Sequence, residues 1–237
     1  MRLFSGLLAA LACLFALPAS AQVIDPVPGR PAPPSPTDKS NIWLLDLSTG
    51  GRVQILLRPD VAPRMVERVK TLTRRGFYDG LLFHRVIDGF MTQGGDPKGD
   101  GTGGSELPDL EAEFNYLPHV RGAVSAARAQ EKNSANSQFF IVFQPKLNLD
   151  KDYTVFGRVM SGMQYVDAIE RGEPPVTPTR ILKAHIASDN PPAFAPPPPA
   201  APADLGPPVT LPGTTPAAEP APQATPAPAR RAAGERR

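Results

Sequence analysis

The sequence predicts a mainly β domain between residues 41 and 190, folded as an antiparallel barrel or sandwich. Two observations favour this class. Many short apolar runs are separated by glycine-rich or polar turns, and just two stretches place apolar residues at helical spacing. These elements also lack the strand–helix–strand alternation that is typical of a parallel sheet. A segment of roughly 150 residues is long enough to bury one good core.

The first elements expected along the domain are a hairpin and a helix. Residues 42–57 hold two apolar runs around Thr49-Gly50-Gly51, which is a hairpin signal. Residues 60–80 have a proline near their start and a glycine near their end, as helix boundaries often do. Between these boundaries, Val66, Val69 and Leu72 recur at helical spacing. This segment is therefore predicted to be the first helix.

The remaining apolar runs are predicted to be strands, with one further helix among them. The strands are placed at residues 81–87, 90–95, 121–127, 137–143, 153–160 and 179–188. The second helix is placed at residues 161–173, because Met163, Val166 and Ile169 would share one of its faces. Two adjacent phenylalanines, Phe139 and Phe140, must point to opposite faces of their strand, and Phe139 is the better core candidate.

The stretch FHRVIDGFMTQGGDPKGDGTGG, residues 83–104, places an arginine and a glutamine among apolar side chains and ends in glycines. Side chains alternate faces along a strand, so the length of the turn decides which residues meet. A two-residue turn would pair Arg85 with Thr92. A three-residue loop over residues 88–90 would instead pair Arg85 with Gln93 and Ile87 with Met91. In the second register a guanidinium and an amide lie side by side next to an apolar wall.

Three stretches in this order, FHRVIDGFMTQGGDPKGDGTGG, GAVSAARAQEKNSANSQFFIVF and VFGRV, resemble the cyclophilin family of peptidyl-prolyl cis/trans isomerases. They are most similar to its exported bacterial members. The resemblance covers residues 42–188. It implies an eight-stranded antiparallel β-barrel capped by two α-helices, in agreement with the elements expected above.

The resemblance also implies a site. It assigns the catalytic role to Arg85. Substrate binding falls on Phe90, Met91, Gln93, Ala127, Arg128, Gln138, Phe140, Leu149 and Tyr153. Of these, Phe90, Met91, Phe140 and Leu149 would form the pocket for proline, and Gln93 would hold the peptide backbone. The glycines at 101–104 would let a peptide approach closely.

Three positions depart from the best-known members of the family. Asn148 stands where they have a tryptophan, Tyr153 where they have a histidine, and Arg128 where many have an asparagine. A tyrosine can still donate a hydrogen bond to a substrate carbonyl. The change at Asn148 predicts weak binding of the macrocycle cyclosporin, but it leaves the arginine and the pocket intact.

The function expected from this resemblance is isomerisation of X-Pro bonds during the folding of exported proteins. Rotation about an amide involves no covalent step, so no cofactor and no metal are expected. The partners would be proline-containing segments of exported proteins, bound by a monomer. Two alternatives stay open: a non-catalytic module that binds proline peptides, and a chaperone or scaffold of the cell envelope.

Other functional classes find little support in the sequence. A net charge of +2 does not indicate a nucleic-acid partner. The glycines at 101–104 lack the Gly-Lys-Ser/Thr ending of a phosphate-binding loop. His84, His119 and His185 are scattered along the chain, and the acidic residues at 109–113 are typical of a solvated face. The mature chain would lack cysteine, since the single one, Cys13, lies in the expected leader.

The two flanks of the domain differ from it in composition. Residues 1–21 are predicted to be a cleaved signal peptide, because Arg2 precedes a short apolar run that ends in Ala19-Ser20-Ala21. A membrane anchor and a lipid-modified Cys13 are the alternatives. Residues 22–40 are expected to be a proline-rich linker and residues 191–237 a disordered tail that acts as a spacer or binds a partner. We therefore expect export to the periplasm, with a lipid-anchored or secreted form as the alternative.

Overall fold

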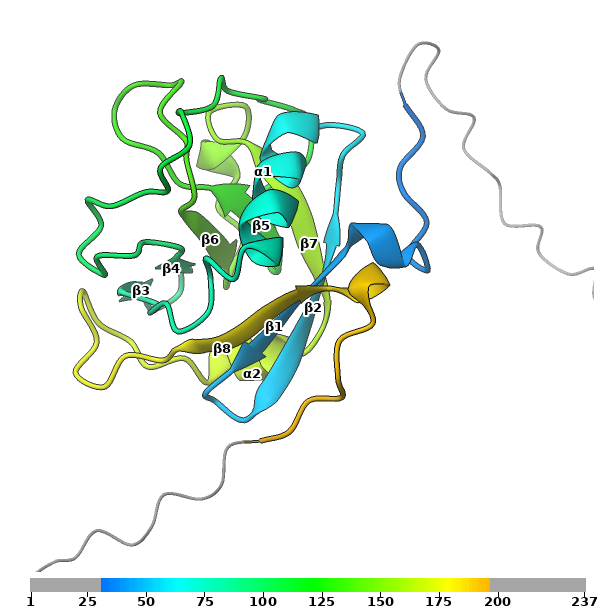
Figure 1. The fold of residues 1–237 in the computed structure, drawn as a ribbon. Helices are drawn as coiled ribbons and strands as arrows, with labels where there is room; N and C mark the ends of the chain where they lie inside the picture. The colour runs from blue at the N-terminus through cyan, green and yellow to red at the C-terminus, as the bar shows by residue number, and fades with distance from the viewer. Residues whose placement is uncertain (1–30, 197–237) are drawn as a thin grey trace, which may run out of the picture. The chain divides into compact units, whose positions relative to one another are not determined.

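Eight short strands form one antiparallel sheet in the computed structural model, which describes residues 31–196 (Figure 1). The strands are β1 (Ile42–Leu47), β2 (Gly51–Leu57), β3 (Arg85–Ile87), β4 (Met91–Gly94), β5 (Ala123–Ala126), β6 (Phe139–Val142), β7 (Val155–Ser161) and β8 (Ile181–Ile186). Their order across the sheet is β3-β4-β6-β5-β7-β2-β1-β8. The mainly β, antiparallel class expected from the sequence is confirmed.

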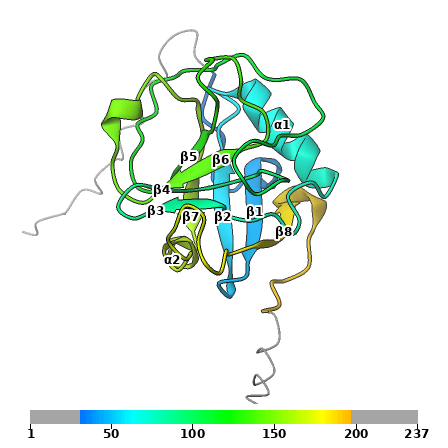
Figure 2. The ribbon, with the colours of Figure 1, turned by 90° about the vertical axis from the view of Figure 1, so that its left-hand side faces the viewer.

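The sheet curls into a half-barrel, and its two ends meet through the segments next to β3 and β8 (Figure 2). Leu82 and Arg180 form an isolated antiparallel bridge. Two backbone bonds support it, from the Phe83 amide to the Thr179 carbonyl at 2.9 Å and from the Gly80 amide to the Ile181 carbonyl at 2.7 Å. These bonds explain why β3 begins at Arg85, whereas the sequence predicted a strand from residue 81. Residues 80–83 bond to the β8 side of the sheet, and on the other side only Leu82 forms a bridge, to Asp96 beyond the end of β4.

Two α-helices lie at opposite ends of the curled sheet, α1 (Pro63–Arg74) and α2 (Met163–Asp167) (Figures 1 and 2). In α1 the residues predicted to face the core, Val66, Val69 and Leu72, are all buried. The amides of Arg64 and Met65 at its start donate to the carboxylate of Glu113, each at 2.9 Å. Glu113, expected on a solvated acidic face, therefore caps a helix whose own preceding residue, Ala62, has no capping side chain.

The second helix is much shorter than the sequence predicted. It ends at Asp167, although Val166 and Ile169 are both buried as expected. The guanidinium of Arg171 donates to the carbonyls of Asp167 and Ile169. A side chain thus satisfies acceptors that backbone amides would satisfy if the helix continued.

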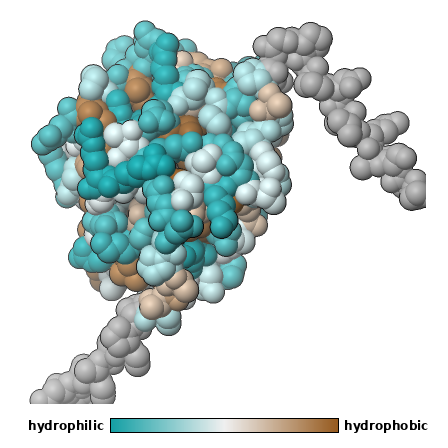
Figure 3. Space-filling model, turned by 45° about the vertical axis from the view of Figure 1, so that its right-hand side comes forward, coloured by the Kyte–Doolittle hydropathy of each residue, from teal (hydrophilic) through white to brown (hydrophobic). Residues whose placement is uncertain are grey.

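An aromatic group lies at the centre of the main core. The ring of Trp43 packs edge-on against Tyr78 at 5.2 Å and against Phe139 at 5.0 Å, and Phe83 lies 6.2 Å from Phe139. All four residues are completely buried. On the face drawn in Figure 3 the surface is mostly hydrophilic, with apolar residues in small separate patches. Buried apolar side chains of the strands pack around this aromatic group.

The expected signal peptide, residues 1–21, lies outside the described residues, as do residues 22–30 of the linker and 197–237 of the tail. Three short 3₁₀ turns complete the described part, at Lys39–Asn41, Leu147–Leu149 and Ala187–Asp189. Between residues 31 and 196, none of the helices is both long and apolar enough to cross a membrane.

Candidate active site

The hairpin of β3 and β4 has the register with a three-residue loop. Arg85 lies opposite Gln93, Val86 opposite Thr92, and Ile87 opposite Met91. The loop is closed by a backbone bond from the Phe90 amide to the Ile87 carbonyl at 3.1 Å. Of the two registers that the sequence allowed, the structure therefore has the one with residues 88–90 in the loop, which brings the guanidinium and the amide together.

One row of side chains crosses four strands on the same face of the sheet. The register pairs Arg85 with Gln93, Gln93 with Phe140, and Phe140 with Ser125. Directly opposite residues in neighbouring strands point to the same face. The side chain of Arg85 is half-exposed, and its Nε donates to the Glu173 carboxylate at 2.8 Å. The row therefore runs from a solvent-accessible cation to a nearly buried aromatic ring.

This face carries a second apolar cluster, separate from the main core. Its buried members are Met91, Ala123, Ala127, Phe140, Val142 and Val155. Partly buried apolar residues, including Phe90, Leu149 and Tyr153, pack around them. The predicted pocket residues therefore do come together, with a buried floor of Met91 and Phe140. The rim is more exposed and is formed by Phe90, Leu149 and Tyr153.

A polar groove of about 390 Å³ adjoins this cluster. Its walls include Gln93, Ala127, Arg128, Gln138 and the glycines at 101–104. Ala127 belongs both to the groove and to the apolar cluster, so the two are continuous. These four residues, all expected to bind substrate, thus line one groove.

A chain of amide hydrogen bonds spans the groove. Gln93 Nε2 donates to Gln138 Oε1 at 2.8 Å. Gln138 Nε2 in turn donates to the carbonyls of Gly101 and Gly103, at 3.0 and 2.8 Å. The orientation of Gln93 is therefore tied to that of the glycine loop.

The glycine loop folds around the carboxylate of Asp96. Its oxygens accept from the amides of Lys98 at 2.8 Å and Gly101 at 2.6 Å. Burial by itself raises the pKa of Asp96, but the amides of Lys98, Gly101 and Gly103 outweigh it and hold that pKa below its ordinary value. A Cβ at residue 103 would lie 2.1 Å from Asp96 Oδ1, so this close approach requires glycine.

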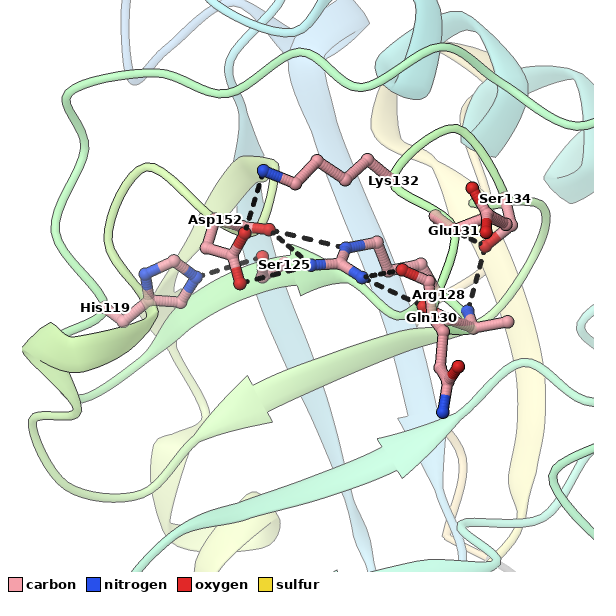
Figure 4. A network of polar contacts seen from close by, with 9 residues as sticks. His119, Ser125, Arg128, Gln130, Glu131, Lys132, Ser134 and Asp152 are labelled. Carbon is pink, nitrogen blue, oxygen red and sulfur yellow. Dashed lines mark hydrogen bonds and ion pairs between the residues drawn. The ribbon is translucent and has the colours of Figure 1, made fainter.

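Arg128 is bound mainly to backbone carbonyls (Figure 4). Its guanidinium donates to the carbonyls of Asp152 at 3.1 Å, Ala129 at 2.9 Å and Gln130 at 3.1 Å. It also lies over the ring of Tyr153, 4.6 Å from the centroid, and forms an ion pair with the Asp152 carboxylate at 3.2 Å. Arg128 therefore joins the loop after β5 to the loop before β7, and both loops border the site.

The sequence showed His119 as one of three scattered histidines and assigned it no role, but the structure surrounds it with partners. His119 is fully buried, and its ring stacks on Phe140 with 6.0 Å between centroids. Its Nδ1 lies 2.8 Å from Asp150 Oδ1, and its Nε2 lies 3.2 Å from the Ser125 hydroxyl. In the sequence, the residue that could have indicated these contacts of His119 is Ser125. It is a polar residue within a buried strand, and its hydroxyl needs a hydrogen-bond partner. His119 supports the floor of the apolar cluster from behind.

Comparison with known proteins places this geometry in a family. Residues 44–186 match the family described as "Cyclophilin type peptidyl-prolyl cis-trans isomerase/CLD". The chain belongs to this family. It is therefore a peptidyl-prolyl cis-trans isomerase, as the resemblance implied.

Individual cyclophilins agree with this assignment. The chain is 47% identical over 171 residues to a "Probable peptidyl-prolyl cis-trans isomerase" of Brucella suis, a match that covers 65% of this chain and 87% of the relative. It is 44% identical over 136 residues to "Peptidyl-prolyl cis-trans isomerase B" of Bacillus subtilis, covering 57% of this chain and 93% of the relative.

Solved cyclophilin structures share the fold. A cyclophilin from Hirschia baltica superposes with a TM-score of 0.60 at 28% identity, covering 64% of this chain and 76% of that one. A cyclophilin from Cryptosporidium parvum, crystallised in the presence of the dipeptide Ala-Pro, superposes with a TM-score of 0.57 at 26% identity. That match covers 61% of this chain and 98% of the other.

Proposed function

We propose that the face carrying Arg85 is the catalytic site of this cyclophilin and that its substrates are proline-containing segments of exported proteins. The assignment of the catalytic site is supported by the row of side chains from Arg85 through Gln93 to Phe140 on one face of the sheet. It sets a half-exposed guanidinium beside an apolar cluster, with a polar groove for the flanking backbone.

The chemistry requires no nucleophile. Rotation about an X-Pro bond is opposed by a barrier of about 18–20 kcal/mol, because it breaks the amide resonance. In the twisted state the proline nitrogen becomes pyramidal and gains a lone pair. A donor that meets this lone pair stabilises the transition state and neither planar state, which is the condition for catalysis. The guanidinium of Arg85 would be that donor, since an arginine side chain carries five N–H donors in a fixed planar arrangement.

The remaining site residues would hold the substrate. The cluster floor formed by Met91 and Phe140 would receive the proline ring, with Phe90, Leu149 and Tyr153 at the rim. Gln93 and the backbone at Ala127 would hold the flanking residues along the groove, where the glycine loop removes side chains. The part of the peptide on the far side of the X-Pro bond would then be able to rotate.

Arg85→Ala tests this assignment. If the guanidinium acts in the transition state, kcat/KM should fall about a hundred- to a thousandfold, as is typical for loss of one preorganised donor. Affinity for a proline peptide should stay within about tenfold of the wild type, since little ground-state contact is lost. Exchange spectroscopy by NMR would measure the rate and titration the affinity, on the same variant. Equal losses of rate and affinity would make Arg85 a binding residue, as a non-catalytic module requires.

The exported context is supported by the sequence at residues 1–21, a charged start and a short apolar run before Ala19-Ser20-Ala21. Cleavage after Ala21 would leave Gln22 as the first residue of the mature protein. N-terminal sequencing of the protein isolated from the exporting cell, together with fractionation, tests this. Intact Met1 or a lipid on Cys13 would contradict cleavage and periplasmic release.

A further inference from the structure

Arg85 lies in the strand at one edge of the sheet, so just one neighbouring strand can orient its side chain. β3 is the first strand in the sheet order, and its ladder partner is β4. The directly opposite residue, Gln93, donates its amide to Gln138. The hairpin by itself therefore places the Cα of Arg85 but does not determine the direction of its long, flexible side chain.

The side chain of Arg85 is held by a residue from a distant segment of the chain. Glu173 Oε2 accepts from Arg85 Nε at 2.8 Å, across 88 residues of sequence. The guanidinium is planar, so a bond at Nε restricts the plane of the whole group. The contact uses the Nε–H, which lies in the guanidinium plane and points to the side of the chain. The two terminal amino groups, which carry the other donors, are not engaged by this carboxylate.

Glu173 is held in place by a loop with several anchors. The Val86 amide donates to the Gly172 carbonyl at 2.8 Å, and the Gly172 amide donates to the Val86 carbonyl at 2.9 Å. These two bonds fasten the residue before Glu173 to the residue after Arg85. Residue 172 has a φ of +145°, and a Cβ there would lie 2.6 Å from the Cα of Pro175. Glycine is therefore required at this point, and the proline after Glu173 restricts the backbone further.

The side chain of Arg171 also holds this loop in place. Arg171 lies over the ring of Phe143, 4.3 Å from its centroid, and forms an ion pair with Asp88 at 3.3 Å. It also donates to two carbonyls at the end of α2. The loop is thus attached to the sheet, to α2 and to the turn between β3 and β4. A carboxylate on such a loop is presented at a defined position.

We propose that Glu173 is a positioning residue for the isomerisation, which orients the guanidinium of Arg85 through Nε and leaves its terminal amino groups directed at the substrate. This rests on the catalytic role proposed above for Arg85. An ion pair as exposed as this one contributes little to the stability of a fold. Its loss should therefore change the rate of isomerisation and hardly change the unfolding transition.

The test compares two substitutions of Glu173 by exchange spectroscopy and peptide titration. Glu173→Ala removes the acceptor, and we expect kcat/KM to fall about tenfold, because a displaced catalytic group loses much of its effect. Glu173→Gln keeps a carbonyl acceptor without the charge, and the loss should be about threefold, since charge-assisted bonds are the stronger ones. Peptide affinity should change by less than about twofold in both variants, as expected when a transition-state contact is affected.

Two control variants separate this role from general effects. Glu170→Gln removes the same charge from an exposed position on the same loop. Asp88→Asn breaks the ion pair with Arg171 that braces the loop. Both should retain kcat/KM within about twofold, because neither carboxylate is the Nε partner of Arg85. In Asp88→Asn the loop keeps its two backbone bonds to Val86 and the contacts of Arg171 with Phe143 and α2. An equal loss in the controls would show that loop attachment matters and would overturn the specific role of Glu173.

The NMR signal of the Arg85 Nε–H group provides a readout that does not depend on activity. It is assigned by its disappearance in Arg85→Lys. We expect it to shift and broaden in Glu173→Ala, to shift less in Glu173→Gln, and to stay unchanged in the controls. An unmoved signal, or a rise in activity on removal of the carboxylate, would overturn the proposal. A different result would separate the two proposals. If the signal shifts in Glu173→Ala but Arg85→Ala keeps full activity, Glu173 does orient Arg85, and it is the catalytic role proposed for Arg85 that is wrong.

Discussion

Phe139 and Phe140 are neighbours in β6, and their rings lie in two different apolar clusters. Phe139 belongs to the main core, where it packs edge-on against Trp43. Phe140 belongs to the cluster on the other face, where it stacks on His119 and meets Tyr153 edge-on at 5.7 Å. Within one strand, Phe139 therefore contributes to the stability of the core, and Phe140 contributes to the candidate active site.

This division predicts opposite consequences for two chemically identical changes. Phe139→Ala should lower the free energy of unfolding by about 3–5 kcal/mol, as expected for truncation of a buried aromatic residue. Phe140→Ala should chiefly weaken peptide binding and kcat/KM, because it removes the floor of the proposed proline pocket. Urea denaturation measures the first effect and exchange spectroscopy, per folded molecule, the second.

Phe139→Leu provides a milder variant if Phe139→Ala does not fold. Its kcat/KM per folded molecule should stay within about twofold of the wild type, since leucine keeps an apolar side chain in the core. The matched change on the other face is Phe140→Leu. If Phe139→Leu lost as much activity as Phe140→Leu, the assignment of the two faces would be contradicted.

Arg85→Lys should recover only part of the activity that Arg85→Ala loses. An ammonium keeps the charge, but it lacks the planar fork and the Nε–H that donates to Glu173. We expect kcat/KM between those of the wild type and the alanine variant, with little change in peptide affinity. Full activity in the lysine variant would show that a positive charge suffices and that the orientation of the guanidinium has no role.

Arg128 is predicted to act through the two loops that it joins. In Arg128→Ala the carbonyls of Ala129, Gln130 and Asp152 lose a donor, which should cost about 1–3 kcal/mol of stability. Hydrogen exchange should accelerate at residues 128–134, and kcat/KM should fall severalfold as Tyr153 loses its stacking partner.

Lys132→Ala is the matched control for this variant. Lys132 also pairs with Asp152, but at 3.8 Å and with a mostly exposed side chain. Its loss should leave both hydrogen exchange and activity close to the wild type. Similar behaviour of the two variants would mean that the charge on Asp152, rather than the carbonyl contacts of Arg128, holds the loops together.

Asp96 predicts how acid affects the glycine loop. Its pKa in the folded protein lies below the ordinary value, so the unfolded chain takes up a proton at a higher pH than the folded protein does. The stability that it contributes is therefore complete above the ordinary pKa of about 4 and is lost as the pH falls through the lowered folded value.

Asp96→Asn should accordingly destabilise the protein by about 2 kcal/mol at pH 7, the scale of hydrogen bonds to a charged group. The difference in the free energy of unfolding between the variant and the wild type should become smaller as the pH falls below 4. Urea denaturation at several pH values measures this. A difference that stayed constant with pH would show that the shape of the side chain, and not its charge, holds the loop.

Much of the fold could be predicted because its signals are local. Val66, Val69 and Leu72 recur at helical spacing, and all three are buried in α1. The three-residue loop between β3 and β4 brings Arg85 opposite Gln93, since side chains alternate along a strand and the loop length sets the register. The expected ends of the strands and of α2 were less accurate, because Arg171 and the bridge between Leu82 and Arg180 decide them.

The sequence by itself predicted the fold class, reduced the hairpin to two possible registers and, through its resemblance to cyclophilins, named the candidate site residues. The tertiary structure alone decided the supporting contacts: Glu173 beside Arg85, and Asp150 and Ser125 around His119. The physical reason is the range of the interactions. Periodicity and turn length act over a few residues, whereas these contacts join segments that meet only after the sheet has curled and its loops have packed across it.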